Sequence, residues 1–474
     1  MKPAGQTSLS WNVLLITSDE HNPKIMGCTG NPCIKTPAFD RLAREGTIFQ
    51  KVYCPYPACA PSRQSMITGL YPQEHGQTGN PVLFSEKNQT WAHYFHEAGY
   101  TTACIGKMHT NNEWNNHGYD YRFGPLDYDA YIQMKTPAWR AAARHTDNYE
   151  REVFSVVAPQ LCREELQAEV LDTPMERRDV VWLDEAKRYL IENKDKPFFL
   201  HVSFTDPHWP WIAPLEYYNM YDPKEIDYPP PLPGSLDDDY LAYNKWKNKH
   251  WDKIPENIQR LCRAKYYGSV SYTDAYVGQL LELTDRLGLS KNTLVIYTSD
   301  HGDMAGEKGL WFKDLMFDSS ARVPMIARMP GMIPAGRKCD ALVSLVDLFP
   351  TIRSLAGVRA PMPQVSGVDM SEVFLGGHSA QEYVYCVYDI NEKTLHPETM
   401  MVRSNRWKCI RYERAPEKLR YVLYDMENDP DETVNYAADP ACAEILKEHL
   451  NAMDQFIAAR KHTDIPPKVV LQIG

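Results

Sequence analysis

The sequence lacks a hydrophobic run long enough to cross a lipid bilayer, which excludes a helical membrane protein. It also lacks an excess of positive charge, because 62 aspartates and glutamates outnumber 51 lysines and arginines and leave a formal net charge of −11. This balance argues against nucleic acid or an anionic membrane as a partner. It is compatible with a small anionic substrate, since a local cationic pocket can lie on an acidic protein.

Paired cysteine motifs are missing too. The 11 cysteines are scattered, and none forms the tight CxxC pair of a zinc ribbon. Most are expected to be buried thiols in a reducing compartment. The opening residues MKPAGQTSLSWN contain no apolar segment of the secretory type, so we expect a cytoplasmic protein. A leader removed during maturation would instead place it in the periplasm or outside the cell.

Four short apolar runs are present, each followed by polar residues. They are Asn12–Ser18, Thr101–Ile105, Phe198–Phe204 and Thr293–Ser299. Near-continuous apolar strands are buried on both faces, as in a mostly parallel sheet covered by helices. Because such sheets bind ligands at the carboxyl ends of their strands, we expect the polar residues to share one edge.

Amphipathic segments predict the covering helices. Pro37–Glu45 begins with proline and stops at Gly46, and Ile258–Leu287 stops at Gly288. After residue 375 the pattern changes to short strands, a turn-rich loop and a closing helix, at Tyr383–Tyr388, Met400–Tyr412, Tyr424–Pro430 and Ala441–Arg460.

We therefore predict an α/β protein of two parts. A large domain over residues 1–375 is built on a mostly parallel sheet flanked by helices. A smaller C-terminal α+β subdomain over residues 376–474 contains a short antiparallel sheet.

The stretch CAPSRQSMITG places a cysteine at the start of a predicted helix. Pro61 suits a first helical turn, so Ser62–Thr68 is expected to be helical and to end at Gly69. Cys59 then lies just before the helix N-terminus, where free N–H groups and the helix dipole favour an anion. Arg63, one turn further on, offers a bidentate donor to an oxyanion. The pattern predicts a nucleophile that faces an anionic group, with a structural thiol as the alternative.

Carboxylates follow two of the apolar runs. Asp19 and Glu20 come after the first run, and Asp300 and His301 come after the last. Three carboxylates and one imidazole at a shared edge suit Ca²⁺, Mg²⁺ or Mn²⁺. A metal ion there would lower the pKa of a nucleophilic hydroxyl and neutralise substrate oxygens. Taken singly, each carboxylate could instead cap a helix.

Cys59-Ala60-Pro61-Ser62-Arg63, with Thr68-Gly69 after a short apolar run, resembles the signature of the type I sulfatases. The resemblance extends from NVLLITSDE to YDMENDPDETVN. It implies an alkaline-phosphatase-like fold, with residues 1–375 as the catalytic domain, and a sulfuric ester hydrolase. In that family a formylglycine-generating enzyme oxidises the cysteine, so the resemblance implies Cα-formylglycine at position 59. One hydroxyl of its hydrate attacks sulfur, and the other later loses its proton so that sulfate leaves by elimination.

The same resemblance implies a divalent cation, usually calcium, between the nucleophile and the two acidic pairs. Many sulfatases have Asp-Asp and Asp-Asn where this chain has Asp19-Glu20 and Asp300-His301. The Asp-His-Gly form resembles choline sulfatases and phosphonate monoester hydrolases. The histidine leaves Mn²⁺ or Mg²⁺ as alternatives to Ca²⁺.

Further site residues follow from the family motifs. Lys107 and His109 lie in Gly-Lys-Met-His, where the family lysine contacts nucleophile and sulfate and the histidine is the base for elimination. His208, in Asp-Pro-His, corresponds to the histidine at the leaving oxygen, and Lys313 corresponds to the second sulfate lysine. Either would be the general acid. Asn80 matches a substrate-contacting asparagine, with a left-handed turn residue as the alternative.

The alcohol part of the ester is less defined. Trp209 and Trp211 could bind a sugar face, enclose a quaternary ammonium group, or simply pack at the rim. A small-molecule or carbohydrate sulfate ester is expected, with a sulfated carbohydrate first because that class dominates the family. A phosphonate monoester or phosphodiester hydrolase and a choline-sulfatase-like enzyme are the alternatives. If Cys59 stays a thiol, the chain would be a metal-supported anion-binding protein. The sequence leaves a homo-oligomer open.

Overall fold

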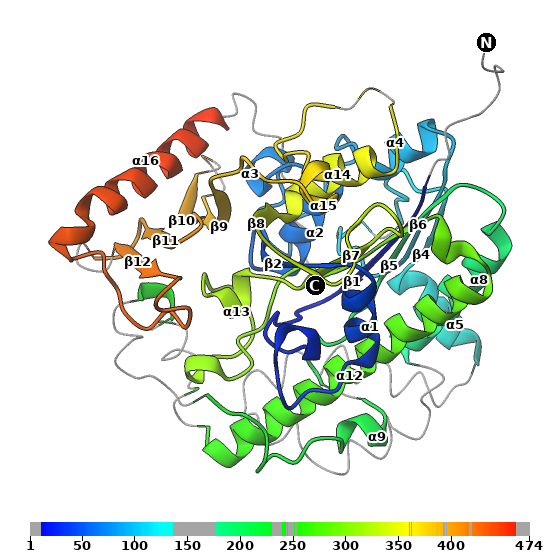
Figure 1. Ribbon diagram of the computed structural model, residues 1–474, viewed down its shortest axis with the longest axis horizontal. Helices are drawn as coiled ribbons and strands as arrows, with labels where there is room; N and C mark the ends of the chain where they lie inside the picture. The colour runs from blue at the N-terminus through cyan, green and yellow to red at the C-terminus, as the bar shows by residue number, and fades with distance from the viewer. Residues whose placement is uncertain are drawn as a thin grey trace.

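A mixed sheet of eight strands lies at the centre of the molecule (Figure 1). The computed structural model describes residues 11–460 except 113, 136–176, 212, 230–238, 243, 245–250, 252–253, 360, 362, 392–393, 395 and 417–419. The strand order is β4-β3-β5-β1-β6-β7-β2-β8. The bounds are β1 Asn12–Ser18, β2 Thr47–Tyr53, β3 Thr101–Gly106, β4 Tyr121–Phe123, β5 Phe198–Ser203, β6 Thr293–Ser299, β7 Met325–Arg328 and β8 Arg337–Ser344. Strand β7 is antiparallel to β6 and β2, and the other neighbouring pairs are parallel.

The four predicted strands are neighbours in this sheet. They form the consecutive parallel set β3-β5-β1-β6, and every residue of β1, β5 and β6 is buried. Ser18 pairs with Ser299, and Gly106 pairs with Ser203, so the strands end level with one another. The predicted shared edge of polar residues is therefore confirmed.

Helices cover both faces of the sheet. In Figure 1, α1 and α12 lie below the sheet, with α8 at its right and in contact with α12. Helices α4 and α14 lie above the sheet, and α2 contacts both of them. Helix α1 has the predicted bounds, and glycine is required after it because a Cβ at Gly46 would lie 2.2 Å from the carbonyl oxygen of Ala327. The bounds are α1 Pro37–Glu45, α2 Cys59–Thr68, α3 Pro72–His75, α4 Trp91–Glu97, α5 Pro125–Lys135, α8 Arg178–Asn193, α9 Leu215–Tyr218, α12 Glu256–Arg286, α13 Asp318–Ala321, α14 Leu348–Leu355 and α15 Ser371–Phe374.

The C-terminal subdomain is an antiparallel sheet of order β12-β11-β10-β9 with α16 (Ala443–Ala459) packed on it (Figure 1). Its strands are β9 Val384–Ile390, β10 Pro397–Arg403, β11 Trp407–Tyr412 and β12 Tyr421–Asp425. The predicted loop over Tyr424–Pro430 is wrong at its start, because Tyr424 belongs to β12 and pairs with Lys408 of β11.

The two parts share packing and backbone contacts. The N–H of Val387 in β9 donates to the carbonyl of Pro55 at 2.9 Å, and Tyr56 and Tyr71 belong to the same apolar cluster as the small sheet. The domain boundary at residue 375 stays a prediction.

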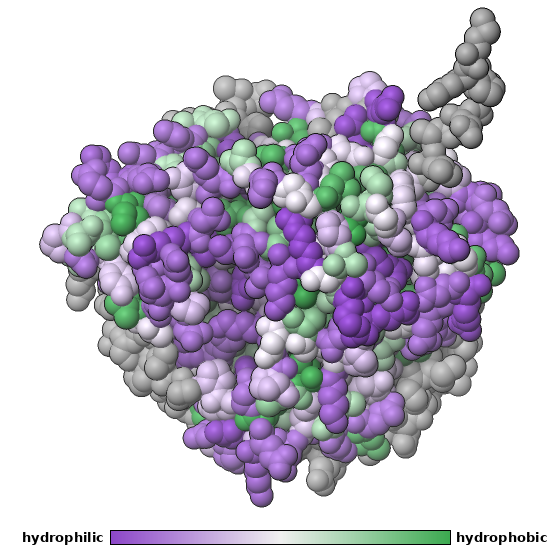
Figure 2. Space-filling view, in the orientation of Figure 1, coloured by the Kyte–Doolittle hydropathy of each residue, from purple (hydrophilic) through white to green (hydrophobic). Residues whose placement is uncertain are grey.

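Apolar surface in Figure 2 is divided into small areas between hydrophilic side chains. Among the described residues, no helix is both long enough and apolar enough to cross a membrane. The cysteines in this part of the chain form no disulfide, and eight of them are buried, as expected for core thiols.

Candidate active site

Helix α2 carries Cys59 at its first position. The helix begins three residues earlier than predicted, directly after the extended residue Ala58, and Pro61 still falls within the first turn. The side-chain oxygen of Asn80 accepts the N–H of Ala60 at 3.0 Å, which satisfies one of the free donors of that turn. The helix ends at Gly69, in a left-handed conformation, as predicted. Asn80 therefore supports the helix that presents Cys59.

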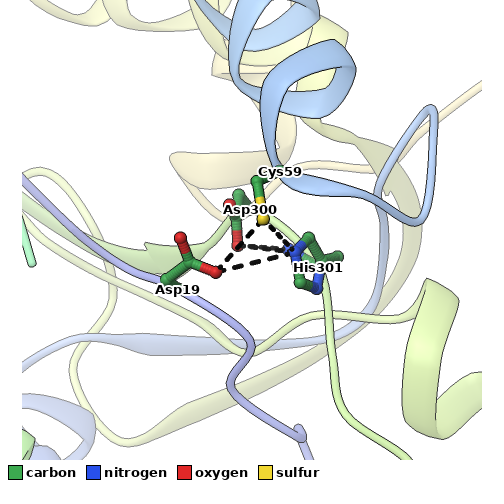
Figure 3. A group of neighbouring side chains, drawn as sticks. All are labelled: Asp19, Cys59, Asp300 and His301. Carbon is green, nitrogen blue, oxygen red and sulfur yellow. Dashed lines mark hydrogen bonds and ion pairs between the residues drawn. The ribbon is translucent and has the colours of Figure 1, made fainter. Parts of the chain in front are cut away.

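Four of the predicted residues converge at the sheet edge. Asp19 follows β1, Asp300 and His301 follow β6, and Cys59 reaches them from α2 (Figure 3). Their donor atoms all lie within 4.8 Å of one another, and all four side chains are buried. The sulfur of Cys59 lies 3.5 Å from Asp19 Oδ1 and 3.2 Å from His301 Nε2. His301 Nε2 lies 3.6 Å from an oxygen of each aspartate.

Glu20 lies beside this group, in a left-handed conformation with φ of 66°. Its backbone N–H donates to Asp300 Oδ1 at 3.2 Å. One carboxylate oxygen, Oε2, lies 3.2 Å from Lys313 Nζ and 3.3 Å from His208 Nε2. The other, Oε1, is buried without a hydrogen-bond partner among the described residues. The side chain thus has an oxygen to spare for a ligand.

Two lysines give the nucleophile an electropositive surrounding. Lys107 Nζ lies 2.6 Å from Asp19 Oδ2, and Lys313 Nζ lies 3.1 Å from the sulfur of Cys59. Burial alone would raise the pKa of the Cys59 thiol, but Lys107, Lys313 and His301 outweigh it and hold that pKa well below its usual range. An anion at this position is therefore stabilised.

Arg63 is held by protein groups. Its Nε donates to Asp300 Oδ2 at 2.7 Å, and its Nη2 lies 3.1 Å from Asp19 Oδ2. Nη1 donates to the carbonyl of Lys107 at 2.8 Å and to the hydroxyl of Ser203 at 2.6 Å. With a side chain only 2% exposed, Arg63 is placed to hold the two aspartates. The structure favours this role over the predicted direct contact with a substrate oxyanion.

Two histidines complete the group around the nucleophile. A hydrogen bond from His109 also stabilises the ionised form of Cys59, and His109 Nδ1 is buried with no partner within the described part of the chain. Burial and Lys313 oppose protonation of His208, but Glu20 and the other acidic groups beside it outweigh them and raise its pKa. The surroundings of His208 thus favour its protonated form.

The donor set fits a divalent cation. It combines oxygens of Asp19 and Asp300 with an imidazole nitrogen of His301 and the sulfur of Cys59, and Glu20 belongs to an adjoining group with Asp19 and His208. Burial opposes a charge on His301, yet Asp300 and Cys59 raise the pKa of this imidazole to about 10. The carboxylates therefore create a field that attracts positive charge to this position.

Comparison with known proteins agrees with this geometry. Residues 11–358 match the sulfatase family profile. The chain belongs to the sulfatase family. Residues 306–459 also match the profile of the N-sulphoglucosamine sulphohydrolase C-terminal region. The predicted enzyme class, a sulfatase that hydrolyses sulfate esters, is confirmed by this membership.

One relative agrees with the family, and the solved structures agree with the fold. The choline-sulfatase of Rhizobium meliloti (strain 1021) is 30% identical over 451 residues, which cover 90% of this chain and 83% of the relative. Among solved structures, a phosphonate monoester hydrolase of Agrobacterium radiobacter aligns with a TM-score of 0.78 at 22% identity, covering 97% of both chains. A protein in complex with its substrate D-glucosamine-2-N,6-O-disulfate aligns with a TM-score of 0.72 at 21% identity, covering 96% of this chain and 99% of that one. The predicted alkaline-phosphatase-like fold is confirmed.

The site of this sulfatase includes two aspartates that the sequence analysis missed. Asp179 accepts the N–H groups of Thr205 and Asp206 at 2.8 and 2.7 Å and so holds the turn that carries His208. Asp303 accepts the N–H of Phe312, the residue before the second lysine, at 3.1 Å. The repeated aspartate in Ser-Asp-His-Gly-Asp was a usable signal for Asp303. Asp179 gives no local signal, because it lies far from its partners in the sequence.

Both predicted tryptophans are part of the apolar core of the sulfatase. Trp209 is 4% exposed and Trp211 is 8% exposed. The ring of Trp211 packs against Trp311, with centroids 5.6 Å apart, and stacks on Phe312 at 6.0 Å. The structure therefore favours the packing alternative for these two residues over direct contact with a substrate.

Proposed function

We propose that this sulfatase cleaves the S–O bond of a sulfated carbohydrate, using Cα-formylglycine derived from Cys59 together with a divalent cation. The observation that carries the proposal is the convergence of Cys59 with Asp19, Asp300 and His301 beneath two lysines. An otherwise costly group of buried charges is arranged around one nucleophilic position. Maturation would require a formylglycine-generating enzyme as a partner.

The sulfur of Cys59 stands where one hydroxyl of the hydrated aldehyde would lie. When present, that hydrate supplies one hydroxyl for attack on sulfur and a second whose deprotonation releases sulfate by elimination. Lys313, 3.1 Å from this position, and Lys107, on the adjacent carboxylate of Asp19, would bind the oxygens of the transferring SO₃ group. Their fixed charges are in place before the reaction begins.

Asp19, Glu20, Asp300 and His301 would hold the divalent cation. When bound, it lowers the pKa of the attacking hydroxyl and neutralises sulfate oxygens. The predominance of oxygen ligands favours Ca²⁺, and the imidazole keeps Mn²⁺ and Mg²⁺ as alternatives. Arg63 would keep the two aspartates oriented toward it.

Proton transfer is assigned to the two histidines. His208, whose pKa is raised and whose side chain is 19% exposed, would donate a proton to the leaving alcohol oxygen. His109, which follows the carboxyl end of β3, would accept the proton of the second hydroxyl as sulfate leaves. One residue thus acts as acid in the first step and the other as base in the second.

The choice of substrate rests on the relatives. The solved neighbour bound to D-glucosamine-2-N,6-O-disulfate supports a sulfated carbohydrate. The 30% identity to a choline-sulfatase supports choline sulfate as a second candidate. A phosphonate monoester is the third, from the neighbour of Agrobacterium radiobacter.

Peptide mass spectrometry over Cys59 tests the proposal, on protein produced together with a formylglycine-generating enzyme. We expect a peptide lighter by the thiol-to-aldehyde exchange, seen together with its hydrate. Sulfated glucosamine, choline sulfate, 4-nitrophenyl sulfate and a phosphonate monoester would then be compared by kcat/KM. An unmodified thiol despite active machinery would reject the formylglycine mechanism and support the anion-binding alternative.

A further inference from the structure

The segment between β6 and α13 carries Lys313 in a conformation that its own residues disfavour. Ala305, Lys308, Phe312 and Asp314 all have positive φ, of 46°, 57°, 64° and 68°. Left-handed backbone at residues other than glycine costs free energy and persists only where surrounding contacts impose it. The contacts that hold this segment therefore decide where Lys313 lies.

Two of these contacts come from the active site. The N–H of Phe312 donates to Asp303 Oδ1 at 3.1 Å, and the N–H of Asp314 donates to the carbonyl of Pro57 at 2.9 Å. Both neighbours of the lysine are thus tied to residues close to His301 and Cys59. These two hydrogen bonds hold the residues beside Lys313. The backbone further along the segment must be held as well, or Lys313 could still move.

Further contacts come from the C-terminal subdomain. Lys408 of β11 is fully buried and donates to the carbonyl of Met316 at 3.1 Å, to Asp318 Oδ1 at 2.5 Å and to Glu432 Oε1 at 2.6 Å. Glu432 accepts the N–H of Asp318 at 2.8 Å through Oε2, and its carbonyl accepts Lys308 Nζ at 2.9 Å. The segment is therefore fastened to the subdomain on both sides of the catalytic lysine.

The contact between the Lys313 segment and the C-terminal subdomain depends on the charge of Lys408. Burial alone would lower the pKa of Lys408, but Asp318 and Glu432 outweigh it and raise that pKa, so the ammonium stays charged. Without the ammonium, Glu432 would lose the cation at its Oε1, and Asp318 would keep its ion pair with Arg322 at 3.0 Å. Either a shift of Asp318 and its segment or uptake of a proton would relieve the repulsion between the carboxylates, and in both cases the contacts of the ammonium with Met316 and Asp318 would be lost.

We propose that Lys408 and Glu432 are positioning residues for sulfate ester hydrolysis, because they hold the Lys313 segment in its strained conformation from the C-terminal subdomain. This inference rests on the proposed role of Lys313 at the transferring sulfate. It gives the subdomain a part in catalysis although neither residue lies among the groups around Cys59.

The test compares Lys408→Met, which removes the charge at similar size, with wild type on 4-nitrophenyl sulfate. We expect kcat/KM per formylglycine-containing site to fall about 10- to 100-fold, since small misplacement of a catalytic group has effects of this size. Lys265→Met is the matched control, because Lys265 is also buried and donates to the carbonyl of Tyr218 at 2.7 Å. The control should stay within about twofold of wild type.

A double variant separates positioning from general damage. If Lys408 acts through Lys313, Lys408→Met should cause no further loss in a Lys313→Ala background. Multiplying losses would overturn the inference, as would full activity of Lys408→Met beside an inactive Lys313→Ala. An active Lys313→Ala would instead overturn the proposed role of that lysine. If Lys408→Met does not fold, Glu432→Gln serves in the same cycle, with the same expectation.

Discussion

Arg63 joins the two aspartates that follow β1 and β6, with Nε 2.7 Å from Asp300 and Nη2 3.1 Å from Asp19. The three side chains are at most 2% exposed. A planar guanidinium is the one side chain that can bind two carboxylates in fixed directions at once. The relative orientation of the two aspartates is therefore determined by Arg63 of α2, the helix that also carries Cys59.

Arg63→Lys should weaken the divalent-cation site. Lysine keeps the charge but cannot contact both aspartates in fixed geometry, so metal affinity should fall about 10- to 100-fold. Metal titration of chelator-treated enzyme, followed by activity, measures this. Arg328→Lys is the control, since Arg328 is a buried arginine paired with Glu45 away from the site. An unchanged metal requirement in Arg63→Lys would count against the assigned role.

The Cys59→Ser variant should accept one sulfate group covalently and then fail to turn over. A serine has a single hydroxyl, so it can accept sulfate but has no second hydroxyl whose deprotonation would release it. Intact-protein mass spectrometry after incubation with substrate should detect a covalent sulfate, while turnover is lost. Cys339→Ala, at a buried thiol distant in sequence from the motif, should stay active. Sustained turnover by Cys59→Ser would contradict the two-hydroxyl mechanism.

His208→Ala should discriminate between leaving groups. A sugar or alkyl alkoxide needs a proton to leave, whereas 4-nitrophenolate does not, so kcat should fall about 10²- to 10⁴-fold for the first class and much less for the second. His96→Ala is the control, at a histidine that is 61% exposed. Equal losses on both substrate classes would assign the general acid elsewhere.

Removal of divalent cations should lower both activity and thermal stability. Asp19, Glu20 and Asp300 would then keep their ion pairs with Arg63, Lys107 and Lys313 but lose the additional positive charge of the cation. A ligand at about 100 times its Kd stabilises the folded state by about 2.7 kcal/mol, so Tm should rise again on re-addition. Calcium, manganese and magnesium compared in this assay would rank the metals. If Tm does not change on addition of any of the three metals, the divalent cation would be removed from the proposal.

The contribution of three buried histidines to stability should fall on acidification below about pH 6.5. Burial lowers the pKa of His21 to about 4 and the pKa values of His75 and His201 to about 3. Between those values and the ordinary 6.5, the unfolded chain binds more protons than the folded one, so acidification favours unfolding. Three such groups contribute up to about 4 kcal/mol per pH unit. Urea unfolding of wild type and His75→Gln from pH 5 to pH 8 should show a shallower slope in the variant; equal slopes would contradict the assignment.

The sheet and its reactive edge were predictable because their signals are local. The run NVLLITS is apolar throughout and ends at Asp19, and TLVIYTS ends at Asp300 in the same way. Burial on both faces then requires a parallel sheet, and parallel strands present their ends together. The start of α2 was placed three residues late because Pro61 fits several positions of a first turn equally well.

Other parts of the site depend on partners that are distant in the sequence. Arg63 was expected to reach an oxyanion, but its partner Asp300 lies 237 residues away and occupies it. Lys408 has the local pattern of a solvent-facing strand residue, and only the packing of β11 against the first domain buries its charge. Tertiary pairing of this kind leaves no period or motif in the sequence, so local reasoning could not find it.

Strand β7 is antiparallel to β6, and this reversal determines where the chain between them can run. If the strand after β6 were parallel to it, the chain would have to cross to the opposite end of the sheet before the next strand could begin. Because β7 is antiparallel, the chain can turn back and start β7 at the same end of the sheet where β6 stops. Residues 300–324 therefore stay at one end of the sheet. Changes in the length of this connection would alter the surroundings of Lys313 without changing the strand order, so we expect enzymes that share this architecture to differ here.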